Sequence, residues 1–304
     1  MKKPPVTLFR VSPLRGLIVW LVFLVFVSLS SYAATVPVHG LWVWKSPAIL
    51  DVPHGAENLV DFCRSSGINE VYISISERSE AAEERQLIHV IALLHHSGIR
   101  AEALLSSADA DEAGKHRETL LRHVQSIVEF NKRRERTDER FDGIHLDIEP
   151  QQRPENKGAG NLKFLPGLAD AFRAVRAVAE SAGMKVNADI QTKLLKGDLA
   201  QRKMLLTAVP RVTLMMYELS SPKDGDSAEQ KADKVAKNSQ KYLDMAYDGL
   251  ADQDVAKMAI ALRAPDYGEL LPRMLKTLDE TNRGNPHYLG WARHSYNDSL
   301  NASR

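Results

Sequence analysis

The sequence has 304 residues, which is enough for one large domain or two small ones. Apolar residues make up 44% and charged residues 26%, the balance of a globular and not of a disordered protein. The formal net charge is +1, so no nucleic-acid partner is expected, and the single cysteine, Cys63, excludes an internal disulfide framework and a cysteine-based zinc cluster.

The first 34 residues differ from the rest of the chain. Basic residues precede the uncharged apolar run 16–29, and small residues follow at Ser31 and Ala33. This order is that of a secretory signal peptide cleaved near Ala33 or Ala34. The apolar run is short for a helix that must cross about 30 Å of hydrocarbon. We therefore expect export to the periplasm, the cell surface or the medium, with an uncleaved N-terminal membrane anchor as the alternative.

Residues 35–304 alternate short β-rich runs with amphipathic helical stretches. Amphipathic stretches such as 81–98 and 165–183 predict helices. Helical stretches end at Gly67, Gly98 and Gly183, where a helix needs a left-handed terminal residue, and the next strand starts at once. The β-rich runs predict eight strands, at 38–45, 69–76, 99–105, 141–149, 184–190, 211–218, 256–263 and 287–294.

This alternation over about 270 residues predicts one (β/α)8 TIM barrel. A doubly wound open sheet alternates in the same way, but no Gly-x-Gly-x-x-Gly turn follows the first strand, and no cofactor is expected. About ten residues follow the eighth strand, so the last helix is expected to be short or missing. No Gly-, Pro- or Ser-rich linker divides the exported part, which predicts a single domain over 35–304.

The predicted strand 141–149 carries acids between apolar residues. Side chains alternate along a strand, so His145, Asp147 and Glu149 share one face, which points into the lumen of a barrel. Glu149, directly before Pro150, lies at the mouth, with Asp147 one layer down and His145 beneath it. Two carboxylates buried together favour a protonated form, as a general acid requires. An ion-paired lumen without chemistry is the alternative.

Other strands bring polar and aromatic side chains to the same rim. Asn187, Asp189 and Gln191 alternate on the fifth strand, and Tyr217 ends the sixth. Trp291 lies near the end of the eighth strand, where an indole ring can form an apolar floor for a sugar. Together these residues predict a polar pocket with an aromatic wall.

The stretch 142–149, Asp-Gly-Ile-His-Leu-Asp-Ile-Glu, resembles the fourth-strand signature of family 18 glycoside hydrolases, Asp-Gly-x-Asp-x-Asp-x-Glu. This family contains chitinases and endo-N-acetylglucosaminidases. The stretch 215–218 is similar to its sixth-strand Met-x-Tyr-Asp, and Trp291 falls where the family carries its eighth-strand tryptophan.

The resemblance implies a role for three residues. Glu149 would protonate the glycosidic oxygen, and Asp147 would orient the substrate's 2-acetamido group, whose carbonyl oxygen attacks the anomeric carbon in place of an enzyme nucleophile. Tyr217 would hydrogen-bond that carbonyl. Residue pattern and resemblance together place substrate contacts at His145, Asp142, Asp189, Glu218, Trp291, Asn187 and Gln191.

Two positions depart from the family pattern. His145 replaces the middle aspartate, which normally shares a proton with the acid at the position of Asp147, and Glu218 replaces the usual Asp or Asn. The expected function is an exported glycosidase acting on an oligo- or polysaccharide that contains N-acetylhexosamine.

Three other functions stay open. A two-carboxylate glycosidase would pair Glu149 with Glu218, Asp189 or Asp266 and act on sugars without an N-acetyl group. A sugar-binding barrel would lack catalysis. A metal-dependent hydrolase would need ligands such as His39 and Asp147, but no His-Glu-x-x-His spacing occurs, so no metal is predicted.

Overall fold

The structure is a computed structural model that describes residues 36–75, 81–157, 162–217, 225–251 and 255–302. The predicted leader, residues 1–34, and the predicted contact residue Glu218 lie outside these ranges. Among the helices that they contain, none has the length and apolar character needed to cross a membrane.

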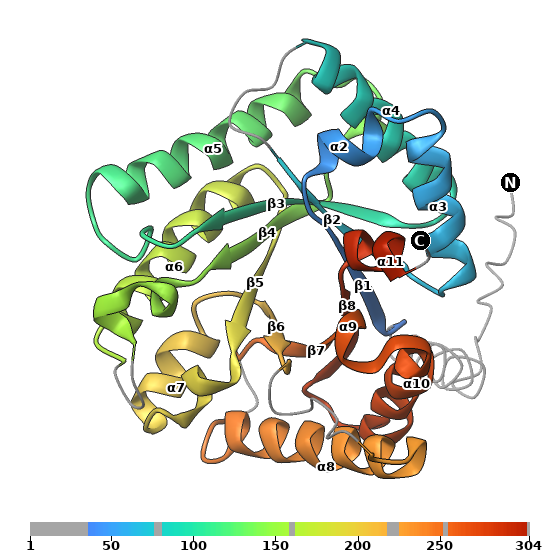
Figure 1. The fold of residues 1–304 in the computed structure, drawn as a ribbon. Coiled ribbons are helices and arrows are strands. Elements are labelled where there is room, and N and C mark those ends of the chain that lie inside the picture. The colour runs from blue at the N-terminus through green and yellow to red at the C-terminus, as the bar shows by residue number, and fades with distance from the viewer. Residues whose placement is uncertain (1–35, 76–80, 158–161, 218–224, 252–254, 303–304) are drawn as a thin grey trace, which may run out of the picture. The chain divides into compact units, whose positions relative to one another are not determined.

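Eight parallel strands close into a barrel in the order of the chain (Figure 1). Each strand pairs with the next, and the eighth pairs with the first. This closure confirms the predicted (β/α)8 barrel and excludes the doubly wound alternative, whose sheet stays open. The strands are β1 (Val38–Val43), β2 (Glu70–Ser74), β3 (Arg100–Ser107), β4 (Gly143–Ile148), β5 (Lys185–Gln191), β6 (Arg211–Met215), β7 (Lys257–Arg263) and β8 (Tyr288–His294).

Helices follow the strands and cover the outside of the barrel (Figure 1). They are α2 (Ser46–Leu50), α3 (Gly55–Ser65), α4 (Ala81–His96), α5 (Lys115–Lys132), α6 (Leu165–Ser181), α7 (Leu199–Leu206), α8 (Ala228–Tyr247), α9 (Ala264–Tyr267), α10 (Leu271–Asn282) and α11 (Tyr296–Ala302). Short 3-10 helices are η1 (Thr137–Glu139), η2 (Pro150–Gln152), η3 (Pro154–Asn156), η4 (Thr192–Lys196) and η5 (Gly268–Leu270). The short α11 after β8 confirms the prediction of a short last helix. Gly67, Gly98 and Gly183 have φ values of 67°, 72° and 74°, as their predicted role at helix ends requires.

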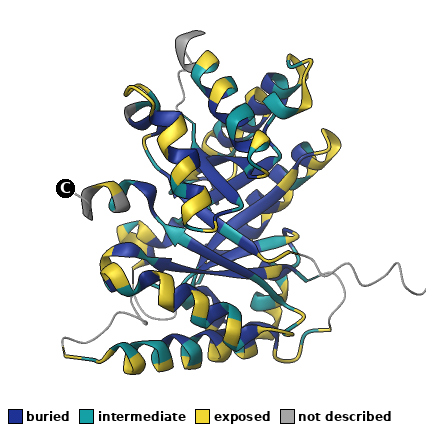
Figure 2. Ribbon diagram, turned by 90° about the vertical axis from the view of Figure 1, so that its right-hand side faces the viewer, coloured by how far each residue is buried: buried dark blue, intermediate teal, exposed yellow. Residues whose placement is uncertain are grey.

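The main core lies between the strands and the helices. Ile144, Leu146 and Ile148 belong to it, which confirms that the apolar face of β4 points outward. Burying each such side chain contributes about 1.5–3 kcal/mol. Figure 2 shows the result: the strands are buried, and the helices expose their outer faces. Cys63 on α3 belongs to the same core as a small buried hydrophobe, and burial raises the pKa of its thiol to about 12.

A second, smaller apolar cluster fills part of the barrel lumen. It contains Trp42, Tyr72 and Leu104 and is completed by small residues of β7 and β8. Gly40 on β1 makes room for it, because a Cβ atom at this position would overlap the Tyr72 hydroxyl. The lumen is therefore packed in its middle, and open space is left towards the carboxyl ends of the strands.

Candidate active site

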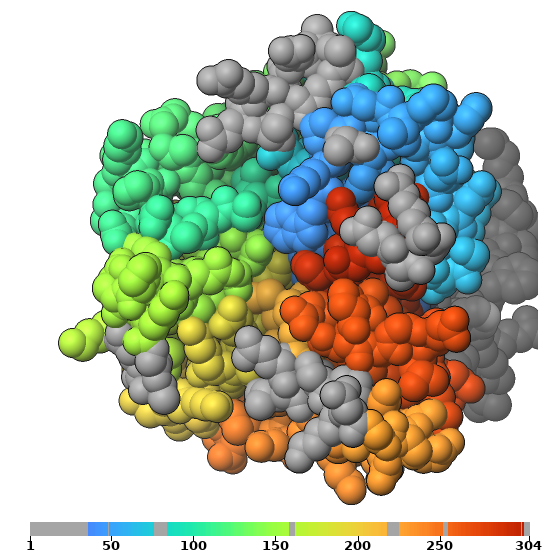
Figure 3. All heavy atoms as spheres, viewed as in Figure 1, coloured from blue at the N-terminus to red at the C-terminus, as the bar shows by residue number. Residues whose placement is uncertain are grey.

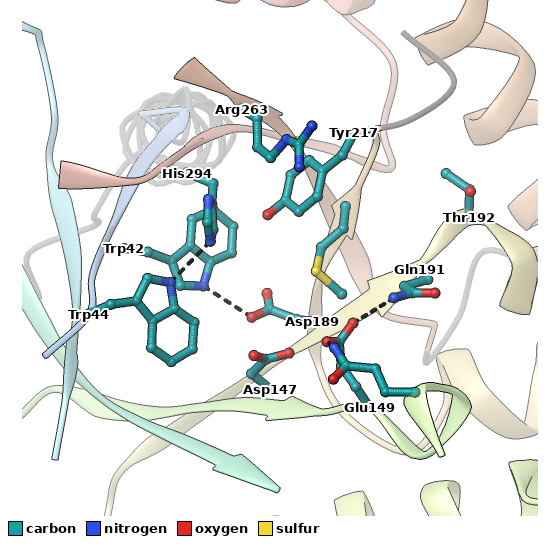
Figure 4. Close-up of a pocket in the computed structure, with 12 residues that line it drawn as sticks. Trp42, Trp44, Asp147, Glu149, Asp189, Gln191, Thr192, Tyr217, Arg263 and His294 are labelled. Atoms are coloured by element: carbon teal, nitrogen blue, oxygen red, sulfur yellow. Dashed lines mark hydrogen bonds between the residues drawn. The ribbon is translucent and has the colours of Figure 1, made fainter. Parts of the chain in front are cut away.

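A cavity of about 270 Å³ opens at the carboxyl ends of the strands. On this face of the barrel, segments from the N-terminal (blue), middle (green to yellow) and C-terminal (orange to red) parts of the described chain meet (Figure 3). Five predicted site residues line the cavity together, namely Asp147, Glu149, Asp189, Gln191 and Tyr217 (Figure 4).

Glu149 directly follows β4 and lies at the mouth of the cavity. Its Oε1 accepts hydrogen bonds from Nε2 of Gln191 at 2.6 Å and of Gln151 at 3.1 Å, and its Oε2 accepts one from Gln152. Burial raises the pKa of Glu149 and the charge of Asp189 adds to this, although the Gln191 amide opposes it. A glutamate that keeps its proton to higher pH suits the role of a general acid.

Asp147 is the next inward-facing residue of β4, one layer below Glu149. Its Oδ1 is buried and accepts no hydrogen bond from any described residue. Burial raises the pKa of Asp147 well above its ordinary value, and the charges of Asp189 and Glu149 raise it further. The folded barrel therefore favours the protonated, neutral form of this acid.

Asp189 on β5 is the third acid of the cavity, and both of its oxygens are bound. Oδ2 accepts a hydrogen bond from Nε1 of Trp42 at 3.1 Å, and Oδ1 lies 2.8 Å from Nε2 of His145. Burial alone would lower the pKa of His145, but the attraction of Asp189 and Glu102 raises it to about 9. The imidazole is therefore protonated at neutral pH and donates to Asp189.

Below His145 the lumen holds a basal ion-pair cluster, which consists of Arg100, Arg211, Glu70 and Glu102. Arg211 donates to Oε1 of Glu102 at 3.1 Å and also to Glu70. Arg100 donates from Nε to Oε2 of Glu70 at 2.9 Å. Glu102 also lies 3.3 Å from Nδ1 of His145. Each acid of this cluster thus has a cationic partner, as buried charges require.

Two predicted contact residues support the cavity from below instead of lining it. His145 is fully buried, and Asn187 lies beside it, with Nδ2 at 3.1 Å from the imidazole Nδ1. Their faces were predicted correctly, because both point into the lumen. They lie one layer below the cavity and do not line it. His145 contacts Asp189 and Glu102, and Asn187 lies against His145.

Asp142 does not belong to the site, and its prediction as a substrate contact is wrong. It precedes β4 at the amino end of the barrel, where its Oδ2 accepts a hydrogen bond from the Ala101 amide at 2.8 Å. The same oxygen lies 2.8 Å from Nε2 of His95 on α4. The side chain thus ties α4 to β3 at the end of the barrel opposite the cavity.

Trp291 is also misplaced by the sequence prediction. In β8 it pairs with Ile260 of β7 and His39 of β1, which puts it on the helix-facing side of the sheet. Its ring stacks on His39 with the centroids 4.1 Å apart, and its Nε1 donates to Asp279 at 3.0 Å. The expectation that it lies under a sugar at the mouth is therefore wrong, because the inward-facing residues of β8 are Ala292 and His294.

The aromatic wall comes instead from β1. Trp42 and Trp44 line one side of the cavity, and His294 lies beside them (Figure 4). Nε1 of Trp44 donates to Nε2 of His294 at 3.0 Å, and the Asn297 amide binds the backbone N–H and C=O of Trp44 at 2.9 and 2.8 Å. The indole N–H groups are thus engaged, and the rings offer the cavity their carbon surface.

Sequence reasoning missed these residues although a signal was present. Trp42 and Trp44 alternate at the end of the first predicted strand, while Arg263 and His294 are the last residues of β7 and β8. The rule that inward residues at strand ends form the site would have selected all four. Gln152 and Thr192 are further lining residues that it missed, whereas Met215 belongs to the stretch 215–218 that resembles the family's sixth strand.

Arg263 is neutralised at the rim. Its Nη2 lies 2.6 Å from Oδ1 of Asp266 and its Nε 3.2 Å from Oδ2, while the guanidinium lies 5.7 Å from the centroid of the Tyr217 ring. Asp266, one of the acids considered as a partner of Glu149, is therefore engaged with Arg263. Of the other two, Asp189 lines the cavity and Glu218 lies outside the described residues.

Metal ligation finds no support in the described part of the chain, which contains no group of three or more His, Cys, Asp or Glu residues placed to hold an ion. His39, considered as a ligand, is bound through Nε2 to Asp279 at 2.9 Å and through Nδ1 to the Gly67 carbonyl at 2.9 Å. It lies beside Trp291, on the outer side of the sheet.

No protein-family model and no curated protein sequence matches this chain. Solved structures of glycoside hydrolases share its barrel. A GH5_18 protein from Bifidobacterium longum subsp. longum, crystallised with Manβ1-4GlcNAc, superposes with a TM-score of 0.57 at 11% identity over 85% of this chain and 69% of its own. An exo-β-1,4-mannosidase from an Opitutaceae bacterium gives 0.54 at 11% identity over 88% and 55%.

A chitinase from Bacteroides thetaiotaomicron gives a TM-score of 0.51 at 13% identity and covers 88% of this chain and 93% of its own. At such identities the likeness extends to the fold and not to the function.

Proposed function

We propose that the protein is an exported glycosidase that hydrolyses O-glycosidic bonds in a glycan containing N-acetylhexosamine. The observation that carries this proposal is the stack of two acids with raised pKa values, Glu149 over Asp147, in one open cavity at the carboxyl end of a (β/α)8 barrel. Export rests on the leader-like residues 1–34.

In the proposed reaction Glu149 donates its proton to the glycosidic oxygen as the bond to the anomeric carbon breaks. The carbonyl oxygen of the substrate's 2-acetamido group attacks that carbon, so a cyclic intermediate forms without an enzyme nucleophile. Asp147 accepts a hydrogen bond from the acetamido N–H, and the Tyr217 hydroxyl donates one to its carbonyl. Glu149, now ionised, then takes a proton from water, which opens the intermediate and restores the acid.

The state of Asp189 favours this route over a two-carboxylate mechanism. A nucleophilic or base carboxylate needs an oxygen free to reach the anomeric carbon or a water. Asp189 has one oxygen bound by Trp42 and the other by His145. A substrate that supplies its own nucleophile does not need Asp189 in that role, and Asp147 is left to bind the acetamido group.

Hydrolysis assays with N-acetylated and non-acetylated oligosaccharides of matched length test the proposal. We expect turnover that depends on the N-acetyl group and that Glu149→Gln abolishes while folding and sugar binding persist. Glu180→Gln, an exposed carboxylate on α6, is the matched control and leaves turnover unchanged. Turnover of plain sugars alone would support the two-carboxylate alternative, and sugar binding without any turnover would make the barrel a lectin.

A further inference from the structure

Asp147 and Asp189 lie next to each other on adjacent strands. The pairing of β4 with β5 runs from Gly143 and Lys185 to Leu146 and Ala188, and the two aspartates follow directly on each strand. Neighbouring strands are about 4.8 Å apart, so two inward-facing side chains at this step lie side by side in the lumen. Figure 4 shows both carboxyl groups directed into the same space.

The two aspartates differ in what holds them. Asp189 receives donors on both oxygens, one from an indole N–H and one from an imidazole whose pKa is about 9. Asp147 has a buried Oδ1 that receives no donor from the described residues. Two adjacent buried carboxyl groups do not both ionise near neutral pH, because like charges in a poorly solvated site repel each other. Donors stabilise the ionised form, so the charge belongs on Asp189.

We propose that Asp189 is a positioning residue that holds the negative charge of this pair, so that Asp147 meets the substrate as a neutral acid whose proton points to Asp189. In the resembling family a fourth-strand aspartate occupies the position of His145. Here the carboxylate is supplied by β5, and His145 is the cation that keeps it ionised. The effect on catalysis rests on the proposed function, whereas the protonation state of the pair does not.

Charged, titratable and aromatic side chains from several strands surround the pair of Asp147 and Asp189. Facing it from elsewhere in the lumen and the rim are Trp42 on β1, Glu102 on β3, His145 and Glu149 on and after β4, Tyr217 after β6, Arg263 on β7 and His294 on β8. Glu149 is the other acid that raises the pKa of Asp147, and His145 lowers it. A test must therefore vary Asp189 while these groups stay in place.

A neutral Asp147 would favour the proposed reaction in two ways. A neutral Asp147 keeps one oxygen available to accept the acetamido N–H while its proton stays with Asp189. It also adds no second full charge beside Glu149 when that residue loses its proton to the leaving group. An ionised Asp147 would still accept the acetamido N–H, but it would place a second full charge beside Glu149 as that residue gives up its proton, so activity is expected to fall as Asp147 loses its proton.

The test is a pH titration of side-chain carboxyl ¹³C NMR signals in protein labelled at aspartate. Loss of a signal in Asp147→Asn and in Asp189→Asn assigns the two residues. We expect the wild-type Asp147 signal to titrate far above the ordinary value near 3.9, and the Asp189 signal to stay that of a carboxylate over the neutral range. Asp189→Asn then moves the Asp147 midpoint to lower pH, and the basic limb of the kcat/KM profile follows it.

Asp170→Asn is the matched control, because it removes one exposed carboxylate on α6 and should move neither signal. An Asp189 signal that titrates high while Asp147 is ionised would overturn the proposal, and so would an Asp147 midpoint unchanged in Asp189→Asn. Should Asp189→Asn fail to fold, the wild-type signal that Asp147→Asn assigns decides: a midpoint near the ordinary aspartate value would overturn the proposal. Loss of the proposed glycosidase activity in every assay would leave this titration as informative as before, so the two ideas fail separately.

Discussion

The barrel lumen holds acids at two levels, and the two levels treat charge differently. In the basal ion-pair cluster, Glu70 and Glu102 share the guanidinium of Arg211, and Arg100 completes the neutralisation of Glu70. At the mouth, Asp147, Glu149 and Asp189 line one cavity, and His145 contacts Asp189 from beneath. The lower level satisfies its charges, whereas the upper level keeps two acids with raised pKa values.

The lower level of the lumen therefore serves the structure, and the upper level holds the groups that can do chemistry. Matched ion pairs fix side chains and leave no reactive proton, because every charge has its partner. Crowded carboxylates store a proton at neutral pH, which acid catalysis requires. His145 joins the levels, since one ring nitrogen faces Glu102 and the other Asp189.

Substituting His145, which contacts an acid of each level, should destabilise both levels. His145→Ala leaves Glu102 and Asp189 without the cation between them, and breaking a buried ion pair costs about 3–5 kcal/mol. The free energy of unfolding, measured by urea denaturation, should fall by this amount. His89→Ala, at an exposed histidine 3.5 Å from Glu57, should change it by less than about 0.5 kcal/mol. Equal small losses in both variants would mean that His145 carries no charge in the folded protein.

The charge of His145 also predicts how stability depends on pH. Its pKa is raised to about 9 in the folded state, above the unfolded value near 6.5. The stabilisation is therefore complete below pH 6.5 and is lost as the pH rises through 9, a change of about 3 kcal/mol. His145→Gln should flatten the curve over this range. Wild-type stability that stays constant from pH 6.5 to 9 would contradict a protonated His145.

Substitutions of two tryptophans compare the mouth of the barrel, where Trp44 lies, with the outer side of the sheet, where Trp291 lies. Trp44→Ala removes part of the cavity wall, so KM for an oligosaccharide should rise by about 2- to 13-fold, which corresponds to the roughly 0.5–1.5 kcal/mol of an aromatic contact beyond its buried area. Trp291→Phe keeps the ring on His39 and loses one hydrogen bond, so it should cost about 1 kcal/mol of stability and leave KM unchanged. A raised KM in Trp291→Phe with an unchanged KM in Trp44→Ala would contradict this placement of the two tryptophans.

The fold was predictable because periodicity is local. The alternation of β-rich and helical stretches predicted the eight strands, and the small number of residues after the eighth strand predicted a short last helix. The same rule placed Glu149, Asp147, Asp189, Gln191 and Tyr217 on one rim. Depth was not predictable, because alternation gives the face of a residue and not the level at which open space begins. His145 and Asn187 therefore have the right face at the wrong level.

The other errors have different physical causes. Trp291 was assigned to the site because it lies near the end of β8. His294, three positions later, points inward, so alternation along the strand directs Trp291 outward. Asp142 was carried over with the motif, although it lies two positions before Ile144, has the same outward direction and precedes the strand. The contact of Trp42 with Asp189 joins residues 147 positions apart, and only closure of the barrel brings them together.

The central claim is that Glu149 delivers a proton to the leaving group, and leaving-group dependence tests it most directly. Aryl glycosides of N-acetylhexosamine that differ only in the aryl group should be compared in wild type and Glu149→Gln. With a poor leaving group the variant should lose about 10²- to 10⁴-fold in kcat/KM, because the proton is missing. With a dinitrophenyl leaving group, which departs without a proton, the loss should shrink to less than about tenfold. A loss that is the same for both substrates, or absent for both, would contradict the assignment of Glu149 as the acid.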